Sequence, residues 1–216
     1  MDSIDLPDLL AGDIVLHRPT APARQLVLLF HGVGASPEGF QGLGPSLARP
    51  DRWVVAVRSP WASDFGEGWQ WFSVQGVTEA NRPDRIAAVM PRFAATVRAW
   101  QSYTGLSAAQ TVLAGFSQGS VMSLESTQVG DPMAMRVVAM SGRFAVPPRK
   151  APSGLAWRFI HGGQDPVIDA AYSTQAAAQL MALGADARAE VLPGLGHGID
   201  PRALALLAGA LDEGLA

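Results

Sequence analysis

The sequence predicts one α/β domain, residues 1–216, with a mostly parallel central sheet, helices on both of its faces and no large cap domain. Short apolar segments alternate with helix-like segments along the whole chain, which is the pattern of strands and crossover helices. Several apolar segments are continuous, without alternating polar residues, as strands buried on both faces are. A chain of 216 residues can enclose one sizeable core, and no repeat or linker divides it.

The composition excludes several functional classes. The chain is 48 % hydrophobic and 16 % charged, so it is globular, and its net charge of −3 without a Lys/Arg cluster argues against nucleic-acid binding. It has no cysteine, which excludes disulfides, thiolate catalysis and cysteine-ligated zinc and fits a reducing compartment. The N-terminus lacks the features of a signal peptide, and no apolar run approaches the ~20 residues of a membrane span. We therefore expect a cytoplasmic protein without stable membrane insertion, and a homodimer stays open.

The first part of the chain predicts three strands. Residues 14–18 resemble a short edge strand, whereas residues 25–30 and 53–57 are almost wholly apolar, as buried strands are. Residues 37–47 between them predict a short helix plus a loop.

A long helix is expected next. Asn81 should cap it, Pro83 lies in its first turn, and Gly105 ends it. Pro91 lies inside the helix and should kink it, because proline has no N–H to donate to the preceding turn. An apolar stripe at helical spacing predicts the face that packs on the core: Ile86, Val89, Met90, Phe93, Val97 and Trp100.

Residues 59–76 form a long connection without a clear period, and such loops are often functional. Exposed aromatic side chains are costly, so we expect its five aromatic residues to fold over something: Trp61, Phe65, Trp69, Trp71 and Phe72. They either pack on the core or form the wall of an acyl or alcohol pocket, and the two roles are compatible. As pocket residues we name Trp69, Trp71 and Phe72.

The rest of the chain continues the alternation of strands and helices. Four apolar segments predict strands: residues 111–115, 136–140, 157–160 and 187–192. Helices are expected over residues 170–183, which Gly184 closes, and over residues 201–211.

Gly115-Phe116-Ser117-Gln118-Gly119 lies between a predicted strand and a helix-like run, and it has the Gly-x-Ser-x-Gly pattern of a nucleophile elbow. The turn is too sharp for ordinary packing, and the two glycines remove the Cβ atoms that would collide there. Ser117 is therefore the candidate nucleophile. A strand-to-helix turn that happens to contain serine would look the same, so the other parts of the site decide between the two interpretations.

A serine nucleophile needs a base, usually histidine, that a third group orients. His17 lies in the edge strand and is expected at the surface, and His31 and His161 directly follow strands, where each is expected to anchor a turn. His197 lies in a glycine-rich loop after the last predicted strand, from which its imidazole can reach Ser117. We assign His197 as the base.

The acid is expected between the nucleophile and the base in chain order. Six carboxylates lie there: Glu125, Asp131, Asp165, Asp169, Asp186 and Glu190. Two lie within a helix or a strand, two precede strands at the opposite end of the sheet, and Asp169 has the position of a helix N-cap. Asp165 alone follows the carboxyl end of a strand on a loop without an evident capping role, so we assign it as the acid.

Hydrolysis also needs N–H donors aimed at the developing oxyanion. The backbone N–H of Gln118, the residue after the nucleophile, is one expected donor. The second should come from the loop after the first buried strand, His31-Gly32-Val33-Gly34, in which the N–H of Val33 is the best candidate. An ordinary tight turn is the alternative interpretation of this loop.

Four segments occur in order and with normal separations: LLFHGVG, GFSQGS, HGGQDPVI and GLGHGID. Together they resemble the α/β-hydrolase superfamily and, within it, the phospholipase/carboxylesterase family that also contains acyl-protein thioesterases. The segments QWFSVQGVTEANR and VRAWQ resemble its YpfH-type branch of bacterial esterases. The resemblance implies the α/β-hydrolase fold and no metal or organic cofactor, and its site residues agree with those assigned above. Ala35 departs from it, because many relatives have aspartate there.

These observations predict a serine carboxylesterase that hydrolyses small carboxylic esters through an acyl-enzyme, with Ser117, Asp165 and His197 as its triad. An acyl thioesterase or lysophospholipase with the same triad is the main alternative, with the aromatic connection setting the acyl length. A third hypothesis is a hydrolase-fold binding protein without catalytic activity, but the presence of all three triad residues argues against it. A metal site from histidines is disfavoured, because their spacing matches no metal motif.

Overall fold

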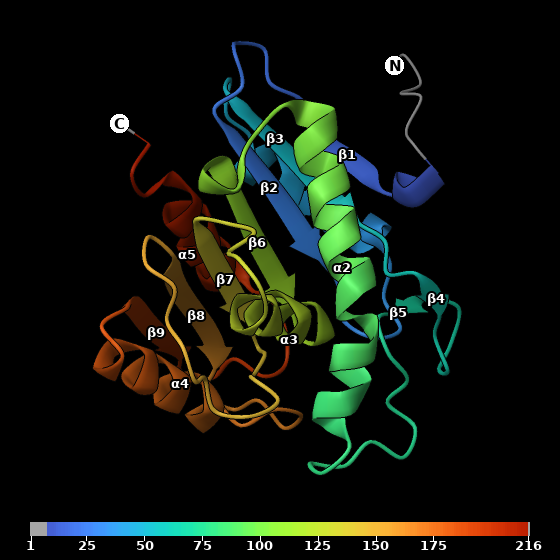
Figure 1. Cartoon of the computed structure of the whole chain (residues 1–216), viewed down its shortest axis with the longest axis vertical. Helices are drawn as coiled ribbons and strands as arrows, with labels where there is room; N and C mark the ends of the chain where they lie inside the picture. The colour runs from blue at the N-terminus through green and yellow to red at the C-terminus, as the bar shows by residue number, and fades with distance from the viewer. Residues whose placement is uncertain (1–7, 216) are drawn as a thin grey trace.

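A seven-stranded sheet lies at the centre of the fold, in the strand order β1-β3-β2-β6-β7-β8-β9 (Figure 1). Its strands are β1 (Ile14–His17), β2 (Gln25–Phe30), β3 (Arg52–Val57), β6 (Thr111–Phe116), β7 (Arg136–Met140), β8 (Ala156–Gly162) and β9 (Asp186–Leu192). β1 runs antiparallel to β3, and all other neighbouring strands are parallel, which confirms the predicted mostly parallel sheet. This computed structural model describes residues 8–215. The first seven residues, in which no signal peptide is expected, lie outside that range.

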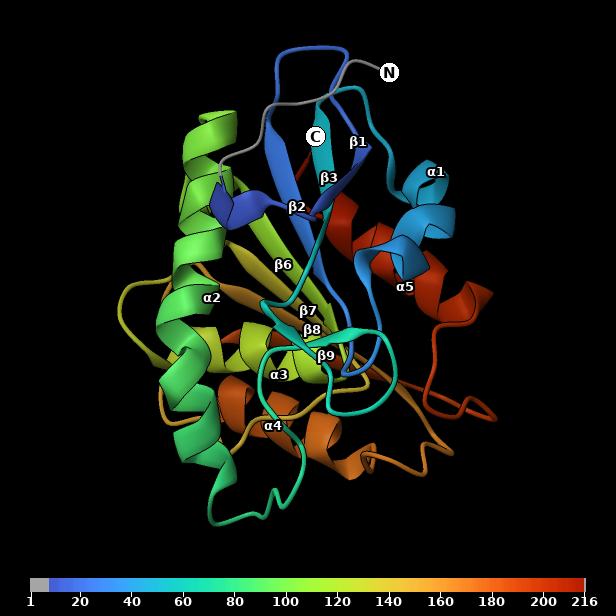
Figure 2. The same cartoon turned by 90° about the vertical axis from the view of Figure 1, so that its right-hand side faces the viewer.

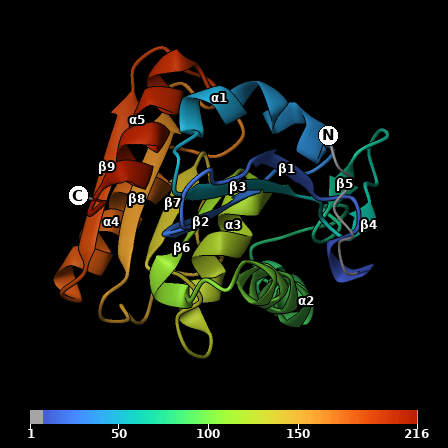
Figure 3. The ribbon, with the colours of Figure 1, turned by 90° about the horizontal axis from the view of Figure 1, so that it is seen from above.

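Helices cover both faces of the sheet, as Figure 2 and Figure 3 show. One face carries α2 (Arg82–Thr104), α3 (Gln118–Glu125) and α4 (Ala171–Ala182), and the other carries α1 (Gly44–Leu47) and α5 (Pro201–Asp212). The 3-10 turns are η1 (Asp8–Leu10), η2 (Pro37–Leu43), η3 (Ala108–Gln110) and η4 (Ser126–Gln128). Residues 8–215 add no large cap domain to these layers, and none of their helices has the length and apolar character needed to cross a membrane.

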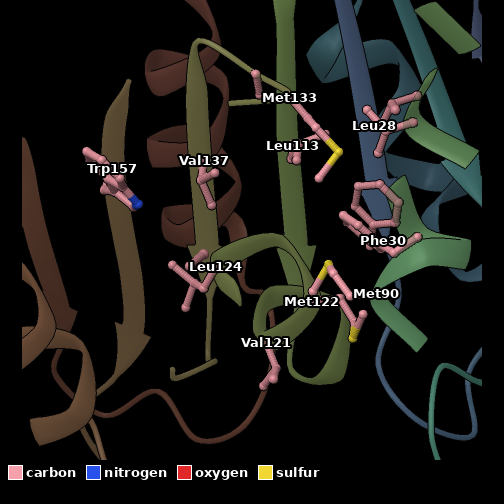
Figure 4. Close-up of a cluster of buried hydrophobic side chains, with 14 of the residues drawn as sticks. Leu28, Phe30, Met90, Leu113, Val121, Met122, Leu124, Met133, Val137 and Trp157 are labelled. Carbon is pink, nitrogen blue, oxygen red and sulfur yellow. The ribbon is translucent and has the colours of Figure 1, made fainter. Parts of the chain in front are cut away.

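The sheet separates two apolar cores. Leu28, Phe30 and Leu113 point to the face of α2 and α3, where they pack with buried helix residues (Figure 4). Val27 and Leu29, which alternate with them along β2, point to the opposite face and pack in the core that includes α5. Because successive side chains of a strand point to opposite faces, a strand between two cores is apolar at every position. This explains the continuous apolar segments of the sequence.

The long helix α2 ends as predicted, but the predicted N-terminal cap is not formed, and the kink at Pro91 stays a prediction. Gly105 adopts a left-handed backbone (φ 70°) that ends the helix, and its N–H donates to the carbonyl of Gln101. Asn81 occupies the N-cap position, but its side-chain oxygen accepts the N–H of Thr78 (2.8 Å) and does not cap the helix. The reason is its backbone, which is helical (φ −102°, ψ −9°) where a capping residue is normally extended.

The predicted structureless connection of residues 59–76 contains a small hairpin of β4 (Trp61–Ala62) and β5 (Trp69–Gln70). The N–H of Gly34 donates to the carbonyl of Trp69 (3.0 Å), so β5 lies against the loop that follows β2. The expectation that all its aromatic residues fold inward is wrong, because Trp61 is 46 % and Phe65 is 56 % exposed on this hairpin. Trp71 and Phe72, which follow the hairpin, are buried.

Candidate active site

Four loops at the carboxyl edge of the sheet carry the predicted site residues. Val33 follows β2, Ser117 follows β6, Asp165 follows β8 and His197 follows β9. Parallel strands end at the same edge, so the loops after them meet there. Val33, Ser117, Gln118 and Asp165 line one cavity of about 720 Å³.

The backbone at Ser117 is strained, as a nucleophile elbow requires. Its φ of 51° and ψ of −115° lie in a region that residues other than glycine rarely adopt. A Cβ on Gly115 would lie 2.3 Å from the carbonyl carbon of Gly119, and a Cβ on Gly119 would lie 2.1 Å from the carbonyl oxygen of Phe30. Both glycines are therefore sterically required, as the pentapeptide predicts.

Asp165 and His197 form a hydrogen-bonded pair. Nδ1 of His197 lies 2.7 Å from Oδ2 of Asp165, whose other oxygen accepts the N–H groups of Val167 (2.8 Å) and Ile168 (3.0 Å). Burial favours a raised pKa for Asp165, but the hydrogen bonds from Ile168, His197 and Val167 outweigh it and lower that pKa below its ordinary value. The ionised carboxylate accepts a hydrogen bond from the Nδ1–H group, a tautomer in which Nε2 of His197 carries the lone pair that a general base needs.

The His197 ring lies against the residue that precedes the candidate nucleophile. It packs against Phe116, the residue before Ser117, with 4.9 Å between ring centroids. Its hydrogen bond goes to Asp165 and not to Ser117 Oγ, and the second bond is often long in enzymes without substrate. The N–H of Gln164 donates to the carbonyl of Leu195 (2.9 Å), which ties the loop of the acid to the loop of the base.

The two predicted oxyanion donors are free. Val33 and Gln118 line the cavity beside Ser117, and within residues 8–215 neither backbone N–H donates to another protein group. The loop around Val33 is shaped by the bond from the Ala35 N–H to the Gly32 carbonyl (3.2 Å) and by the positive φ (75°) of Gly34. The loop thus leaves a backbone donor available at Val33.

His31 anchors this same loop, as the sequence predicts. Its Nδ1 lies 2.8 Å from the carbonyl oxygen of Gly32, and its Nε2 accepts the backbone N–H of Ser59 (3.2 Å) and lies 2.9 Å from its hydroxyl. Burial lowers the pKa of His31, which keeps the ring neutral so that one nitrogen can donate and the other accept.

His161 has a contact that sequence reasoning missed. It is fully buried, and its Nε2 lies 3.2 Å from Oδ2 of Asp165 and 2.8 Å from the carbonyl oxygen of Ile168. Its Nδ1 lies 2.7 Å from the hydroxyl of Ser173. The ring therefore anchors the turn after β8, as predicted, and also lies against the candidate acid. No group of three or more His, Cys, Asp or Glu side chains in the described chain is arranged to hold a metal ion.

The side chain of Gln118 also has a role that the sequence does not predict. Its Oε1 accepts the N–H of Trp71 (2.8 Å), and its Nε2 donates to the carbonyl of Phe72 (2.8 Å). The buried amide thus fixes the end of the aromatic connection to the first turn of α3. Its backbone donor was expected, but its side-chain partners lie more than forty residues earlier in the chain and leave no local sequence signal.

Of the three predicted pocket residues, only Phe72 lines the cavity. Trp71 is buried in the core, where its ring packs against Phe93 at 5.1 Å, and Trp69 lies under the guanidinium of Arg58 at 4.3 Å. The structure therefore does not place these two tryptophans in the cavity wall, because Trp69 packs on Arg58 and Trp71 packs in the core. The cavity wall instead includes four residues not singled out from the sequence: Glu79, Arg82, Arg143 and Tyr172.

The sequence profile of the phospholipase/carboxylesterase family matches residues 11–213. The chain belongs to the phospholipase/carboxylesterase family. Esterase YpfH of Escherichia coli (strain K12) is 45 % identical to it over 192 residues, which are 88 % of this chain and 83 % of that protein. Membership in this family identifies the protein as an ester hydrolase.

Solved structures agree with the fold of this family member. The crystal structure of esterase PE8 superposes with a TM-score of 0.84 at 28 % identity and covers 94 % of this chain and 98 % of that chain. Zea mays acyl-protein thioesterase 2 superposes with a TM-score of 0.76 at 20 % identity and covers 94 % of this chain and 99 % of that chain. At that identity the second likeness shows the shared α/β-hydrolase fold alone.

Proposed function

We propose that this family member is a serine carboxylesterase that hydrolyses small carboxylic esters through an acyl-enzyme. Ser117 Oγ attacks the ester carbonyl while Nε2 of His197 takes its proton, and the N–H groups of Val33 and Gln118 stabilise the oxyanion. His197 then protonates the leaving alcohol. Water activated by His197 hydrolyses the acyl-enzyme, which releases the acid and restores Ser117.

The observation that carries this proposal is the 2.7 Å contact between His197 Nδ1 and Asp165 Oδ2 beside the strained Ser117. A carboxylate in this position orients the imidazole and stabilises the imidazolium that forms during attack. In serine proteases the loss of this carboxylate lowers kcat by about 10⁴-fold. We expect Asp165→Asn to lower esterase activity by a similar order.

The cavity wall supports small esters over long-chain lipids. Charged side chains of Glu79, Arg82 and Arg143 share the cavity with Ser117, and an alkyl chain laid on them would remove water without replacing its hydrogen bonds. An acyl thioesterase with the same triad is the alternative, because an acyl-protein thioesterase shares the fold. Rates on oxygen esters and thioesters of matched, increasing acyl length separate the two functions.

The replacement Ser117→Ala tests the chemistry. We expect it to abolish hydrolysis of short-chain p-nitrophenyl esters while circular dichroism and melting temperature stay unchanged, because the side chain supplies only the nucleophile. Ser102→Ala, on the exposed surface of α2, is the matched control and should keep full activity. A fluorophosphonate probe should label the wild type and not the Ser117 variant. Full activity in that variant would contradict the proposal, and a wild type that neither labels nor hydrolyses esters would indicate a silent binding protein.

Location and assembly complete the proposal. A chain without cysteine suits a reducing compartment, and we place the enzyme in the cytoplasm, where its partner is a small ester or thioester. Cell fractionation tests the location. Light scattering during size exclusion tests whether the enzyme forms a homodimer.

A further inference from the structure

The cavity beside Ser117 has two unlike walls. One wall is apolar and includes Val33, Phe72 and Val121. The other wall carries Glu79, Arg82 and Arg143, which we call the Arg143 cluster. Arg82 is the first residue of α2, Glu79 lies in the turn before it, and Arg143 lies in the loop after β7. The cluster therefore joins two distant parts of the chain across the cavity.

Two arginines in this cluster share one carboxylate. Nη1 of Arg143 donates to Oε1 of Glu79 (3.1 Å), its Nη2 donates to Oε2, and Nη2 of Arg82 donates to Oε1 (2.9 Å). The hydrogen bond from Arg143 is the largest of the influences that lower the pKa of Glu79, so the carboxyl group is ionised. The cluster therefore has one positive charge in excess.

The positive part of the cluster is fixed, and the negative part is accessible. The side chain of Arg143 is 9 % exposed, its guanidinium stacks on the ring of Tyr172 at 4.0 Å, and its Nε donates to the carbonyl of Phe144 (3.1 Å). The side chain of Glu79 is 65 % exposed. Glu79 thus binds both guanidinium groups from the solvent side, in the way that a carboxylate of a ligand would.

The position of Arg143 connects it to the nucleophile. It follows Gly142, where an added Cβ would lie 2.1 Å from the Cβ of Ser120 and 3.3 Å from the carbonyl oxygen of Ser117. The backbone that carries Arg143 therefore packs directly on the elbow. Two further carboxylates line the cavity outside the cluster: Asp165 pairs with His197 (2.7 Å), and Oδ1 of Asp169 accepts the N–H of Ala171 (2.8 Å) at the start of α4.

We propose that the Arg143 cluster is a specificity subsite for an anionic group, so that the preferred substrates are short esters that end in a carboxylate. Arg pairs with a carboxylate through two parallel hydrogen bonds, and such bonds are stronger in a partly buried site than in water. The incoming carboxylate joins Glu79 at the two guanidinium groups or replaces it. This inference rests on the proposed esterase function and names the class of ester.

Two pairs of isosteric esters test the subsite. Monomethyl glutarate and methyl 5-oxohexanoate differ only in a carboxylate against a methyl ketone on the acyl half. The esters 4-acetoxybutyrate and 5-acetoxypentan-2-one differ in the same way on the alcohol half. For the half that enters the cavity, we expect kcat/KM of the wild type to favour the anionic ester on the order of tenfold, as expected for a charge-assisted contact.

Variants then locate the preference. Arg143→Met and Arg82→Met should each reduce the ratio of anionic to neutral kcat/KM toward one, whereas Glu79→Gln should raise it, because the competing carboxylate is gone. Arg149→Met, at an exposed position of the same loop, is the matched control and should keep the wild-type ratio. If Arg143→Met does not fold, Glu79→Gln and Arg82→Met still decide the question.

Failure of the subsite and failure of the proposed function give different results. Equal kcat/KM within both ester pairs in an active wild type would refute the subsite and leave the esterase intact. A wild-type preference that is unchanged in all three cluster variants would refute it as well. No hydrolysis of any ester by folded wild type would refute the proposed function itself.

Discussion

Asp165 is held at both of its carboxylate oxygens. Backbone N–H groups of Val167 and Ile168 bind Oδ1, whereas His197 and His161 both approach Oδ2. The Ser173 hydroxyl lies at Nδ1 of His161, and when it donates there the ring proton lies on Nε2, which faces Oδ2. That proton donates to the carbonyl oxygen of Ile168 (2.8 Å), with Oδ2 of Asp165 at 3.2 Å, so His161 holds the turn whose N–H groups bind the candidate acid.

This arrangement predicts a positioning effect at His161. Replacing it by Leu removes the hydrogen bond to the buried Ile168 carbonyl, a contact that contributes about 0.5–1.5 kcal/mol. We expect kcat to fall roughly tenfold with KM nearly unchanged. The acid limb of the pH–rate profile should move to higher pH, because the Ile168 and Val167 N–H groups that favour the ionised form of Asp165 lose the anchor of their turn.

Two further variants separate positioning from simple destabilisation. His161→Gln keeps a donor of similar reach and should restore most of the activity, and Ser173→Ala should have a smaller effect, since it removes a contact one step from the acid. If the Leu and Gln variants lose activity in proportion to their loss of stability, with an unchanged pH profile, the positioning role of His161 is refuted.

At the scale of elements, Arg52 joins both ends of the chain. From β3 its guanidinium donates to Gln25 on β2, to the carbonyl of Leu47 at the end of α1 (2.8 Å), and to the carbonyl of Leu211 (3.1 Å) and the carboxylate of Asp212 (2.6 Å) on α5. Its side chain is only 2 % exposed. It is thus a buried charge whose hydrogen bonds link one face of the sheet to α1 and α5.

Removing this charge should destabilise the protein strongly. Arg52→Met leaves the Leu47 carbonyl and Oε1 of Gln25 without this donor, and each buried acceptor left unsatisfied costs about 1–3 kcal/mol. Arg49→Met is the matched control, because that side chain is 34 % exposed and a surface ion pair contributes at most about 1 kcal/mol. Urea unfolding measures the free energy of unfolding of both variants. Similar losses of stability in the two variants would show that the hydrogen bonds of Arg52 contribute no more than a surface ion pair.

The elements themselves were predictable where a physical signal was local. Strands such as β2 and β6 lie between two cores and are apolar at every position, so their limits agree with the structure within about two residues. β4 and β5 have two residues each, too short for any period, and were missed. The prediction that Asn81 caps α2 is wrong, because its side chain accepts a hydrogen bond from the preceding turn, and the sequence gives no sign of this contact.

At the scale of the whole molecule, Asp13 changes the stability with pH in the opposite direction to most other carboxyl groups. Several carboxyl groups have lowered pKa values through arginine contacts, and these stabilise the fold less as the pH falls; Glu79, Asp186 and Glu213 are examples. Burial instead raises the pKa of Asp13 from 3.8 to about 6, against the hydrogen bonds from Trp100 and Arg58. The folded state therefore binds this proton more tightly than the unfolded chain.

The sign of the resulting pH dependence is defined. The stabilisation from protonated Asp13 is complete below pH 3.8 and is lost as the pH rises to about 6. The free energy of unfolding of Asp13→Asn, relative to wild type, should therefore increase between pH 4 and pH 7, by up to about 3 kcal/mol. Urea unfolding at several pH values gives this difference, from which the other carboxyl groups cancel. A difference that is independent of pH would contradict the assignment.

The candidate site shows a similar division between local and distant signals. Ser117, Asp165 and His197 each follow a predicted strand, and parallel topology alone brings their loops to one edge. The contact between Arg143 and Glu79 joins residues 64 positions apart, and no period or motif marks it. Local signals therefore predict the loops of the candidate chemical residues and, in the cavity wall, Phe72, but they do not mark Glu79, Arg82 or Arg143.

The amide of Gln118 has a consequence for how new specificity can arise in this fold. It binds the aromatic connection only through the main chain, at the N–H of Trp71 and the carbonyl of Phe72. A substitution at position 72 therefore keeps the hydrogen bonds of Gln118 to the main chain. The same substitution changes the shape of the cavity, because this side chain lines it. Laboratory evolution of acyl preference can randomise position 72 and its neighbours in the cavity while the positions of Ser117 and its partners stay unchanged.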